Sequence, residues 1–290
     1  MTDDIRFQTK DGLSIYARSY GDPNAPHTVL CLHGLTRNHK DFEPMIEALL
    51  PDHPDTRFIA WDTRGRCKSE YDPDPSHYAL PIYAEDVIGL IEHLHLEKFS
   101  LIGTSMGGLI SMVLMSLIPE RIKGVVMNDI GPVIEVEGLN RIASYLGKNK
   151  PVADFEAAAQ ALKSKQAGAF PDYTDEDWLK FARRTHATRE DGQVEADYDP
   201  NLVKNFAIPD STDENDESMW TLYRGMSASP FLLIRGEISE LLSEKTARRM
   251  LNAHPDAEMA TVPRIGHAPV LDEPEAVSAI SQFLKKVKAA

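Results

Sequence analysis

The sequence has only two cysteines in 290 residues, and neither belongs to a recognisable pattern. Cys31 lies inside an apolar run, where a buried and unreactive thiol is the usual state. Cys67 lies in a polar turn with no metal-ligand spacing around it. A disulfide framework and a metal site are therefore not expected, and the sequence indicates no other cofactor.

Long apolar segments are also missing. The longest run, residues 109–118, is about half the length that a membrane-spanning helix needs. Residues 1–4 are acidic and lack the basic start and apolar stretch of a secretion signal. We therefore expect a cytoplasmic protein without membrane attachment.

Basic residues are too few to balance the acidic ones. The chain has 31 lysines and arginines against 45 aspartates and glutamates, a formal net charge of -14. Such a surface repels nucleic-acid phosphates and anionic membranes. The expected partner is therefore a small molecule, and the charge leaves the oligomeric state open.

Short apolar runs alternate with segments of helical periodicity along most of the chain. The runs lack polar alternation, which is typical of parallel strands buried on both faces, and the first twenty residues predict a hairpin around Asp11-Gly12. The runs cover residues 28–32, 57–61, 99–102, 124–127, 231–234 and 259–262, and the helical segments cover 42–50, 82–94, 106–118, 241–251 and 274–287. The pattern predicts an α/β fold: a mostly parallel central sheet with helices on both faces and an antiparallel edge.

The alternation stops between residues 133 and 216. Helical patterns occur there at residues 139–146, 155–162 and 177–185, without a run typical of a core strand. An insertion of this size between two sheet strands predicts a helical cap over the strand ends. We expect a core formed by residues 1–132 and 217–290, and a cap formed by residues 133–216.

The strongest chemical signal is the segment Gly103-Thr104-Ser105-Met106-Gly107-Gly108. It matches G-x-S-x-G, the nucleophile elbow, in which a serine lies on a sharp turn between a strand and a helix. The bare pattern is common by chance, but here a buried strand is predicted before it and an apolar helix after it. These neighbours favour a nucleophilic Ser105 over a glycine-rich turn that only packs helix on strand.

A second segment, His33-Gly34-Leu35-Thr36, follows the predicted strand at residues 28–32. In hydrolases with an elbow, the loop after this strand donates one backbone N–H to the oxyanion, and the residue after the nucleophile donates the other. Leu35 and Met106 are therefore the predicted donors. We expect the His33 ring itself to bond backbone.

A third segment, Gly266-His267-Ala268-Pro269, lies in a loop after the last predicted strand. Its histidine would lie over the same edge of the sheet as Ser105. The order of serine before histidine is the one that elbow hydrolases use. His267 is therefore the predicted general base, in preference to an exposed loop histidine.

The acid that would orient this histidine has two candidates. Glu240 ends the loop after the predicted strand at residues 231–234, just before a helix. Asp129 lies at the end of the predicted strand at residues 124–127. Chain position favours Glu240, and Asp129 is the alternative.

These motifs resemble the α/β-hydrolase family over nearly the whole chain. Residues 62–69, Asp-Thr-Arg-Gly-Arg-Cys-Lys-Ser, resemble the family's Asp-x-Arg-Gly-x-Gly-x-Ser stretch, with Cys67 in place of the second glycine. Residues 128–132 and 235–237 resemble a bacterial branch that includes carboxylesterases and meta-cleavage-product hydrolases. That branch usually carries aspartate where this sequence has Glu240.

The resemblance and the serine at the elbow imply a serine hydrolase, carboxylesterase-like, that cleaves an ester-like bond of a small organic substrate through an acyl-enzyme. The alternatives are C–C bond hydrolysis of ring-cleavage products and non-catalytic ligand binding by the same fold. Arg37 and Asn38, just past the oxyanion turn, are candidates for binding a substrate carboxylate, against a solvated loop. Four aromatic residues in or beside the cap could line an acyl pocket or form the cap's own core: Tyr145, Phe155, Trp178 and Trp220.

Overall fold

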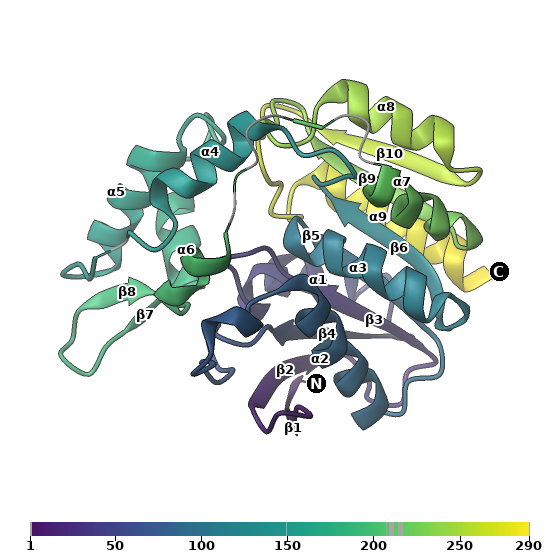
Figure 1. The fold of residues 1–290 in the computed structure, drawn as a ribbon, viewed down its shortest axis with the longest axis horizontal. Helices are drawn as coiled ribbons and strands as arrows, with labels where there is room; N and C mark the ends of the chain where they lie inside the picture. Colours follow the sequence, from purple (N-terminus) through teal and green to yellow (C-terminus); the bar gives the residue numbers. More distant parts are fainter. Residues whose placement is uncertain (1, 149, 207, 209–211, 214–216, 290) are drawn as a thin grey trace.

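A computed structural model describes residues 2–148, 150–206, 208, 212–213 and 217–289. Within these residues, an eight-stranded sheet crosses the molecule in the order β1-β2-β4-β3-β5-β6-β9-β10 (Figure 1). Its strands are β1 (Thr2–Gln8), β2 (Ser14–Tyr20), β3 (His27–Leu32), β4 (Thr56–Asp62), β5 (Phe99–Thr104), β6 (Ile122–Asn128), β9 (Phe231–Gly236) and β10 (Ala257–Val262). The strands from β4 to β10 are parallel, and β2 is antiparallel to β1 and β4. The predicted sheet is therefore confirmed.

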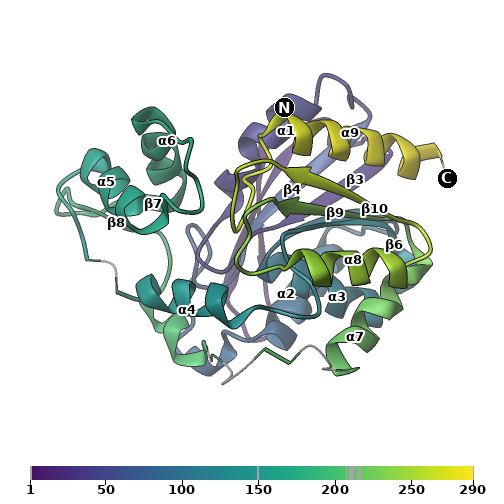
Figure 2. The same cartoon turned by 90° about the horizontal axis from the view of Figure 1, so that it is seen from above.

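Helices cover both faces of this sheet (Figure 2). Helices α1 and α9 lie on one face, and α2, α3 and α8 lie on the other, with α7 against α3. The core helices are α1 (Glu43–Leu49), α2 (Leu80–His93), α3 (Met106–Leu117), α7 (Glu217–Arg224), α8 (Glu244–Ala253) and α9 (Pro274–Ala289). Among the described helices, none combines the length and the apolar character needed to cross a membrane.

The strands are apolar along their length because each one is buried on two sides. In β3, Leu30 and Leu32 belong to the cluster under α2 and α3, whereas Val29 and Cys31 belong to the cluster under α1 and α9. Side chains alternate between the faces of a strand, so every position needs an apolar residue when both faces are covered.

The chain between β6 and β9 leaves the sheet and forms a separate group of elements, which we call the α4–α6 segment. It contains α4 (Val136–Tyr145), α5 (Phe155–Gln166), α6 (Asp175–Thr185), β7 (His186–Thr188) and β8 (Val194–Ala196), and most of it projects to the left in Figure 1. Strands β7 and β8 form a two-stranded sheet of their own, and Val194 of β8 also forms a bridge with Val152. The sequence pattern did not predict them, because three residues are too few to show a period. The assignment of residues 133–216 to a cap domain stays a prediction.

Helix α8 begins later than residue 241, where the sequence pattern placed it. Ser243 accepts a hydrogen bond from the Thr246 N–H and thereby caps the helix. Just before it, the Leu242 carbonyl oxygen accepts a hydrogen bond from Arg235 Nε at 3.0 Å. The residues after β9 therefore form a fixed turn at the carboxyl end of the sheet.

Two glycines allow α3 to start directly against the sheet. A Cβ on Gly107 would lie 1.9 Å from the Leu32 carbonyl oxygen, and a Cβ on Gly103 would lie 2.5 Å from the Gly107 carbonyl oxygen. Both clashes are with backbone, which cannot move aside as a side chain can. The strand-to-helix turn around Ser105 therefore depends on glycine at these positions.

We expect Gly107→Ala to lower the free energy of unfolding by at least about 2 kcal/mol, because the added methyl group pushes α3 away from β3. Urea unfolding followed by circular dichroism measures this change. Gly168→Ala is the matched control, since a Cβ there meets no atom within 4 Å. The control should stay within about 0.5 kcal/mol of the original protein. Equal stabilities of the two variants would contradict the packing argument.

Candidate active site

Ser105 lies on the sharp turn between β5 and α3. Its backbone has φ 51° and ψ -114°, a conformation that residues with a side chain rarely adopt. The Ser105 N–H donates to the Asn128 carbonyl oxygen at 2.9 Å, so the end of the neighbouring strand β6 holds the turn in place. The Ser105 side chain therefore lies beyond the carboxyl ends of the parallel strands, where α/β folds bind their ligands.

Ser105, His267 and Asp129 form one chain of hydrogen bonds. His267 Nε2 lies 2.9 Å from Ser105 Oγ, and His267 Nδ1 lies 2.9 Å from Asp129 Oδ2. The Asp129 carboxylate also accepts hydrogen bonds from the Gly236 N–H at 2.9 Å and the Ser239 hydroxyl at 2.6 Å. Asp129 is completely buried, and these three donors compensate its charge.

Glu240, the acid preferred from the sequence, does not lie against His267. Its Oε2 lies 2.6 Å from Arg141 Nε of α4, and its side chain is 39% exposed. Asp129 directly follows β6, where its N–H donates to the Ile234 carbonyl oxygen of β9 at 2.8 Å, whereas Glu240 lies further along the loop after β9 and turns to α4. The expected placement is therefore corrected, because the alternative, Asp129, is the carboxylate at His267.

Three contacts hold the loop that carries His267. Arg141 Nη2 donates to the His267 carbonyl oxygen at 3.2 Å, and Asn128 Nδ2 donates to the Pro269 carbonyl oxygen at 2.7 Å. The third contact runs from the Gly266 N–H to the carbonyl oxygen of Ala169, in the turn between α5 and α6, at 2.6 Å. The α4–α6 segment supplies two of these contacts and so helps to place the His267 ring over Ser105. Neither Arg141 nor Ala169 stands out in the sequence.

The Leu35 N–H, one predicted oxyanion donor, is oriented through the carbonyl group of its own peptide unit. That carbonyl oxygen belongs to Gly34 and accepts hydrogen bonds from His33 Nδ1 at 2.7 Å and the Arg37 N–H at 3.1 Å. A peptide unit is planar and trans, so fixing its carbonyl group also fixes the opposite direction of the N–H. Arg66 Nε holds the next carbonyl, that of Leu35, at 3.1 Å.

The Met106 N–H, the second predicted donor, is fixed in the same way. The Ser105 carbonyl oxygen in its peptide unit accepts hydrogen bonds from the Gly108 and Leu109 N–H groups at 2.8 and 3.2 Å. As the first residue of α3, Met106 has no acceptor within the helix. In the described part of the chain, neither predicted donor N–H is engaged by another residue. Two oriented and unengaged amides beside Ser105 can stabilise a developing oxyanion.

The buried His33 ring holds the turn before Leu35. Its Nε2 accepts a hydrogen bond from the Thr63 N–H at 3.0 Å, so the ring proton lies on Nδ1 and is donated to the Gly34 carbonyl oxygen. Burial lowers the pKa of His33 to about 4. The ring bonds backbone, as expected from the sequence.

Two cavities meet at Ser105. The first, about 70 Å³, lies beside His267 and is lined by residues that include Arg37, Tyr145, Phe170 and Phe181; we call it the His267-side cavity. A further cavity of about 40 Å³ adjoins it and shares several lining residues: Thr36, Arg37, Tyr145, Gln166 and Phe181.

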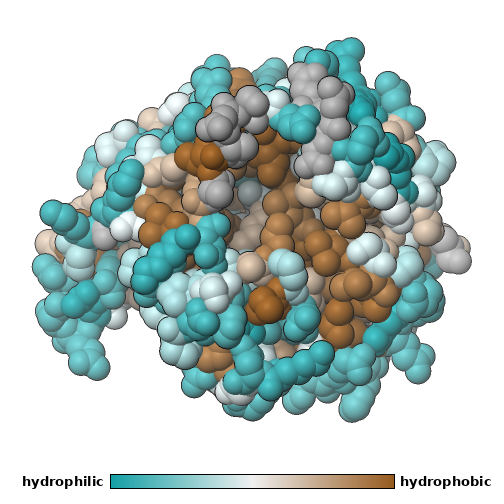
Figure 3. Space-filling view, viewed as in Figure 1, coloured by the Kyte–Doolittle hydropathy of each residue, from teal (hydrophilic) through white to brown (hydrophobic). Residues whose placement is uncertain are grey.

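The second cavity, which we call the Met106-side cavity, has a volume of about 470 Å³. Its walls are mainly apolar, and no charged side chain of the described residues lines it. The apolar lining residues include Met106, Leu109, Ile134, Leu139 and Leu241. Figure 3 shows a recess rimmed by apolar side chains on the face seen there. The site therefore has two arms of different polarity.

Of the four aromatic residues singled out from the sequence, Tyr145 lines the His267-side cavity. Trp178 is buried with its ring edge-on to Phe170 at 6.0 Å, and so supports a residue of the cavity wall. Trp220 is buried against Tyr223 in the core under α3, and Phe155 packs beside Arg183. Neither of the last two lines either cavity.

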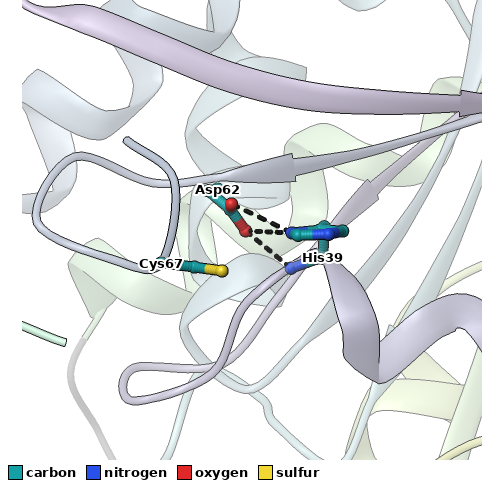
Figure 4. A group of neighbouring side chains, drawn as sticks. All are labelled: His39, Asp62 and Cys67. Atoms are coloured by element: carbon teal, nitrogen blue, oxygen red, sulfur yellow. Dashed lines mark hydrogen bonds and ion pairs between the residues drawn. The ribbon is translucent and has the colours of Figure 1, made fainter. Parts of the chain in front are cut away.

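A His-Asp-Cys group lies outside the hydrogen-bond chain of Ser105. Ligand atoms of His39, Asp62 and Cys67 lie within 4.8 Å of one another (Figure 4). His39 follows β3, Asp62 ends β4, and Cys67 lies in the loop after β4. The spacing of these residues in the sequence does not reveal the group. The Asp62 carboxylate already accepts hydrogen bonds from the His39 ring and N–H and from the Lys68 N–H. Burial raises the pKa of the Cys67 thiol. The contacts at Asp62 join the two loops.

The comparisons with known proteins agree with this fold. A family model described as the alpha/beta hydrolase fold matches residues 27–274, so the chain belongs to this family. The resemblance found in the sequence is therefore confirmed, and the chain is a hydrolase of the α/β fold.

Individual relatives match the chain over most of its length. The 3-hydroxybutyrate-oligomer hydrolase of Cupriavidus necator is 33% identical over 269 residues, 91% of this chain and 90% of that protein. The 2-(acetamidomethylene)succinate hydrolase of Mesorhizobium japonicum is 28% identical over 88% of this chain and 87% of that protein. The crystal structure of an alpha/beta hydrolase from Novosphingobium aromaticivorans is 39% identical, covers 98% of both chains and has a TM-score of 0.90.

We expect the His33 ring to stay neutral from pH 8 to pH 5, with its proton on Nδ1. A pKa below the ordinary 6.5 means that the folded state resists protonation, so the stability from this ring is present above pH 6.5 and is lost as the pH falls toward 4. Ring 15N resonances of 15N-histidine-labelled protein measure the charge and the tautomer, with His33→Gln to assign the signal. Titration of this ring near pH 6.5 would contradict its assigned burial and partners.

Proposed function

We propose that this chain is a serine hydrolase that cleaves an ester-like bond of a small organic substrate through an acyl-enzyme. Ser105 is the nucleophile, His267 is the general base, and Asp129 orients the histidine and stabilises its protonated form. The observation that carries the proposal is the continuous hydrogen-bond chain from Ser105 Oγ through His267 to Asp129. The Leu35 and Met106 amides form the oxyanion hole.

The reaction follows from this geometry in two steps. His267 Nε2 takes the proton of Ser105 Oγ as the oxygen attacks the carbonyl carbon, and the protonated ring then gives this proton to the leaving alcohol. The acyl group stays on Ser105. A water molecule, deprotonated by the same nitrogen, attacks the acyl-enzyme, and the proton returns to Ser105 as the acid leaves.

The need to protonate the leaving alcohol determines which part of the substrate each cavity holds. Because His267 Nε2 must reach the leaving oxygen, the alcohol part of the substrate occupies the His267-side cavity. The acyl part occupies the Met106-side cavity, whose lining is apolar and includes the two oxyanion donors. Residues 133–216 act as a cap, since Ile142 and Tyr145 of α4 line the site.

One relative supports cleavage of an ester. The Cupriavidus necator relative is a 3-hydroxybutyrate-oligomer hydrolase, and the units of such an oligomer are joined by ester bonds. The 2-(acetamidomethylene)succinate hydrolase of Mesorhizobium japonicum acts on a different kind of compound, so C–C bond hydrolysis stays the alternative. A binding-only role is the second alternative, and the experiment below tests both.

We expect the protein to hydrolyse p-nitrophenyl esters of short acyl chains, and Ser105→Ala to lower kcat/KM by at least about 10,000-fold. Release of p-nitrophenol, followed by absorbance, measures the rates. Thr104→Ser is the control on the same turn, because it keeps a hydroxyl group at a side chain outside the Ser105–His267–Asp129 chain. If the folded protein hydrolyses no ester in the series, carboxylesterase activity is excluded. Ring-cleavage products would then be the substrates to test, and ligand binding without catalysis would be the other function to test.

We expect Asp129→Ala to lower kcat on the same esters by about 1,000- to 10,000-fold, because His267 loses the carboxylate that fixes its tautomer. Glu240→Ala should lower it by less than about tenfold, since it removes a half-exposed ion pair with Arg141. The ratio of the two losses is the measurement. A larger loss for Glu240→Ala would return the role of the acid to that residue.

A further inference from the structure

Arg37 lines both adjoining cavities on the His267 side of the site. A Cβ placed on Gly34 would lie 3.5 Å from Arg37 Cγ and 3.7 Å from Ser105 Cβ. The stem of the Arg37 side chain and Ser105 are therefore both close to Gly34, and Arg37 forms part of the wall of both cavities.

The Arg37 guanidinium is held on one edge and one face. Its Nε donates to Asp41 Oδ2 at 2.5 Å, and its Cζ lies 4.0 Å from the centre of the Phe181 ring. Within the residues that the structure describes, its two Nη groups have no acceptor, and they are not enclosed by protein. A planar guanidinium with a free pair of N–H donors matches a carboxylate, and its fixed position reduces the entropy that binding would cost.

The other groups on this side leave the guanidinium as an attractive site for an anion. Asp41 also lines the His267-side cavity, and its Oδ2 is paired with the Nε edge rather than with the two Nη groups. Lys165 lines the adjoining cavity and adds positive charge, and His186 there is neutral because burial lowers its pKa to about 4. Arg37 and Lys165 therefore place positive charge on this side of the site, although the net charge of the chain is -14.

Asn38, the other carboxylate-binding candidate from the sequence, is already engaged. It is almost completely buried, its Oδ1 accepts a hydrogen bond from the Lys40 N–H, and its Nδ2 donates to the Arg184 carbonyl oxygen. The two neighbouring residues therefore differ: Asn38 stabilises the loop, and Arg37 keeps donors for a ligand.

From these observations we infer that Arg37 binds a carboxylate on the alcohol part of the substrate, so that the substrate class is acyl esters of short hydroxycarboxylic acids. The inference rests on the proposed function, because that function places the alcohol in the His267-side cavity. The acyl part needs no charge, since no charged side chain of the described residues lines the Met106-side cavity. The products are a carboxylic acid from the acyl part and a free hydroxycarboxylic acid.

The test compares two substrates of the same shape, 3-butanoyloxybutanoate and the neutral 3-butanoyloxybutanamide. Arg37→Ala should lower kcat/KM for the anionic ester by about 10- to 100-fold, the loss expected for a hydrogen bond to a charged group. The neutral amide should change by less than about threefold. Arg37→Lys should recover part of the anionic rate, because it restores the charge without the paired donors. Butanoate release, measured by chromatography, gives the rates.

Arg183→Ala is the matched control. Arg183 also lies beside an aromatic ring, that of Phe155 at 5.4 Å, but it lines neither cavity at Ser105. This variant should treat both substrates as the original protein does. An equal loss on both substrates in Arg37→Ala would show only a packing role and overturn the inference, and so would no loss on either.

A second measurement separates failure of the inference from failure of the proposed function. If the original protein cleaves neither ester, the proposed function fails. The carboxylate site at Arg37 is then tested by measuring the binding of a hydroxycarboxylic acid. Ser105→Ala protein should bind 3-hydroxybutanoate in an NMR titration, and adding Arg37→Ala should raise the Kd at least tenfold. Absence of binding to Ser105→Ala, or an unchanged Kd in the double variant, would overturn the carboxylate site.

Discussion

Helix α3 starts so close to the sheet that Gly107 has no room for a side chain beside the Leu32 carbonyl oxygen. This contact fixes the sharp turn at Ser105 and therefore the direction of both the Ser105 hydroxyl and the Met106 amide. The Leu35 amide on the facing loop is fixed by hydrogen bonds, because the carbonyl group on the far side of its peptide unit accepts two of them. The Ser105 hydroxyl and the two proposed oxyanion donors are thus oriented before any substrate arrives, which is the condition for effective electrostatic stabilisation.

Local patterns in the sequence were sufficient for the fold and for much of the site. Strands buried on both faces are continuously apolar, so residues such as 28–32 and 57–61 could be identified without tertiary information. Ser105 and His267 follow strands in segments with their own glycines, and the structure brings these two side chains into contact. The hairpin of β7 and β8 escaped detection, since its strands have three residues each.

The sequence could not distinguish the two candidate acids, because Asp129 and Glu240 each follow a strand that ends at the same edge of the sheet. Which carboxylate contacts His267 depends on the path of the loop after each strand, which is a tertiary property. The same limit applies to contacts between distant segments, such as Arg141 with the His267 carbonyl oxygen or His39 with Asp62. Arg37 and Asn38 are neighbours in one loop, and only the folded structure distinguishes a residue that lines a cavity from one that caps a turn.

The His267 loop is bonded to α4 through Arg141 and to the turn between α5 and α6 through Ala169. A displacement of the α4–α6 segment large enough to break these contacts would also release the histidine from its place over Ser105. The position of the α4–α6 segment and the position of the His267 ring are therefore mechanically coupled. A chain that folds its sheet correctly but misplaces these helices would keep the turn at Ser105 and lose the contact between Ser105 and His267.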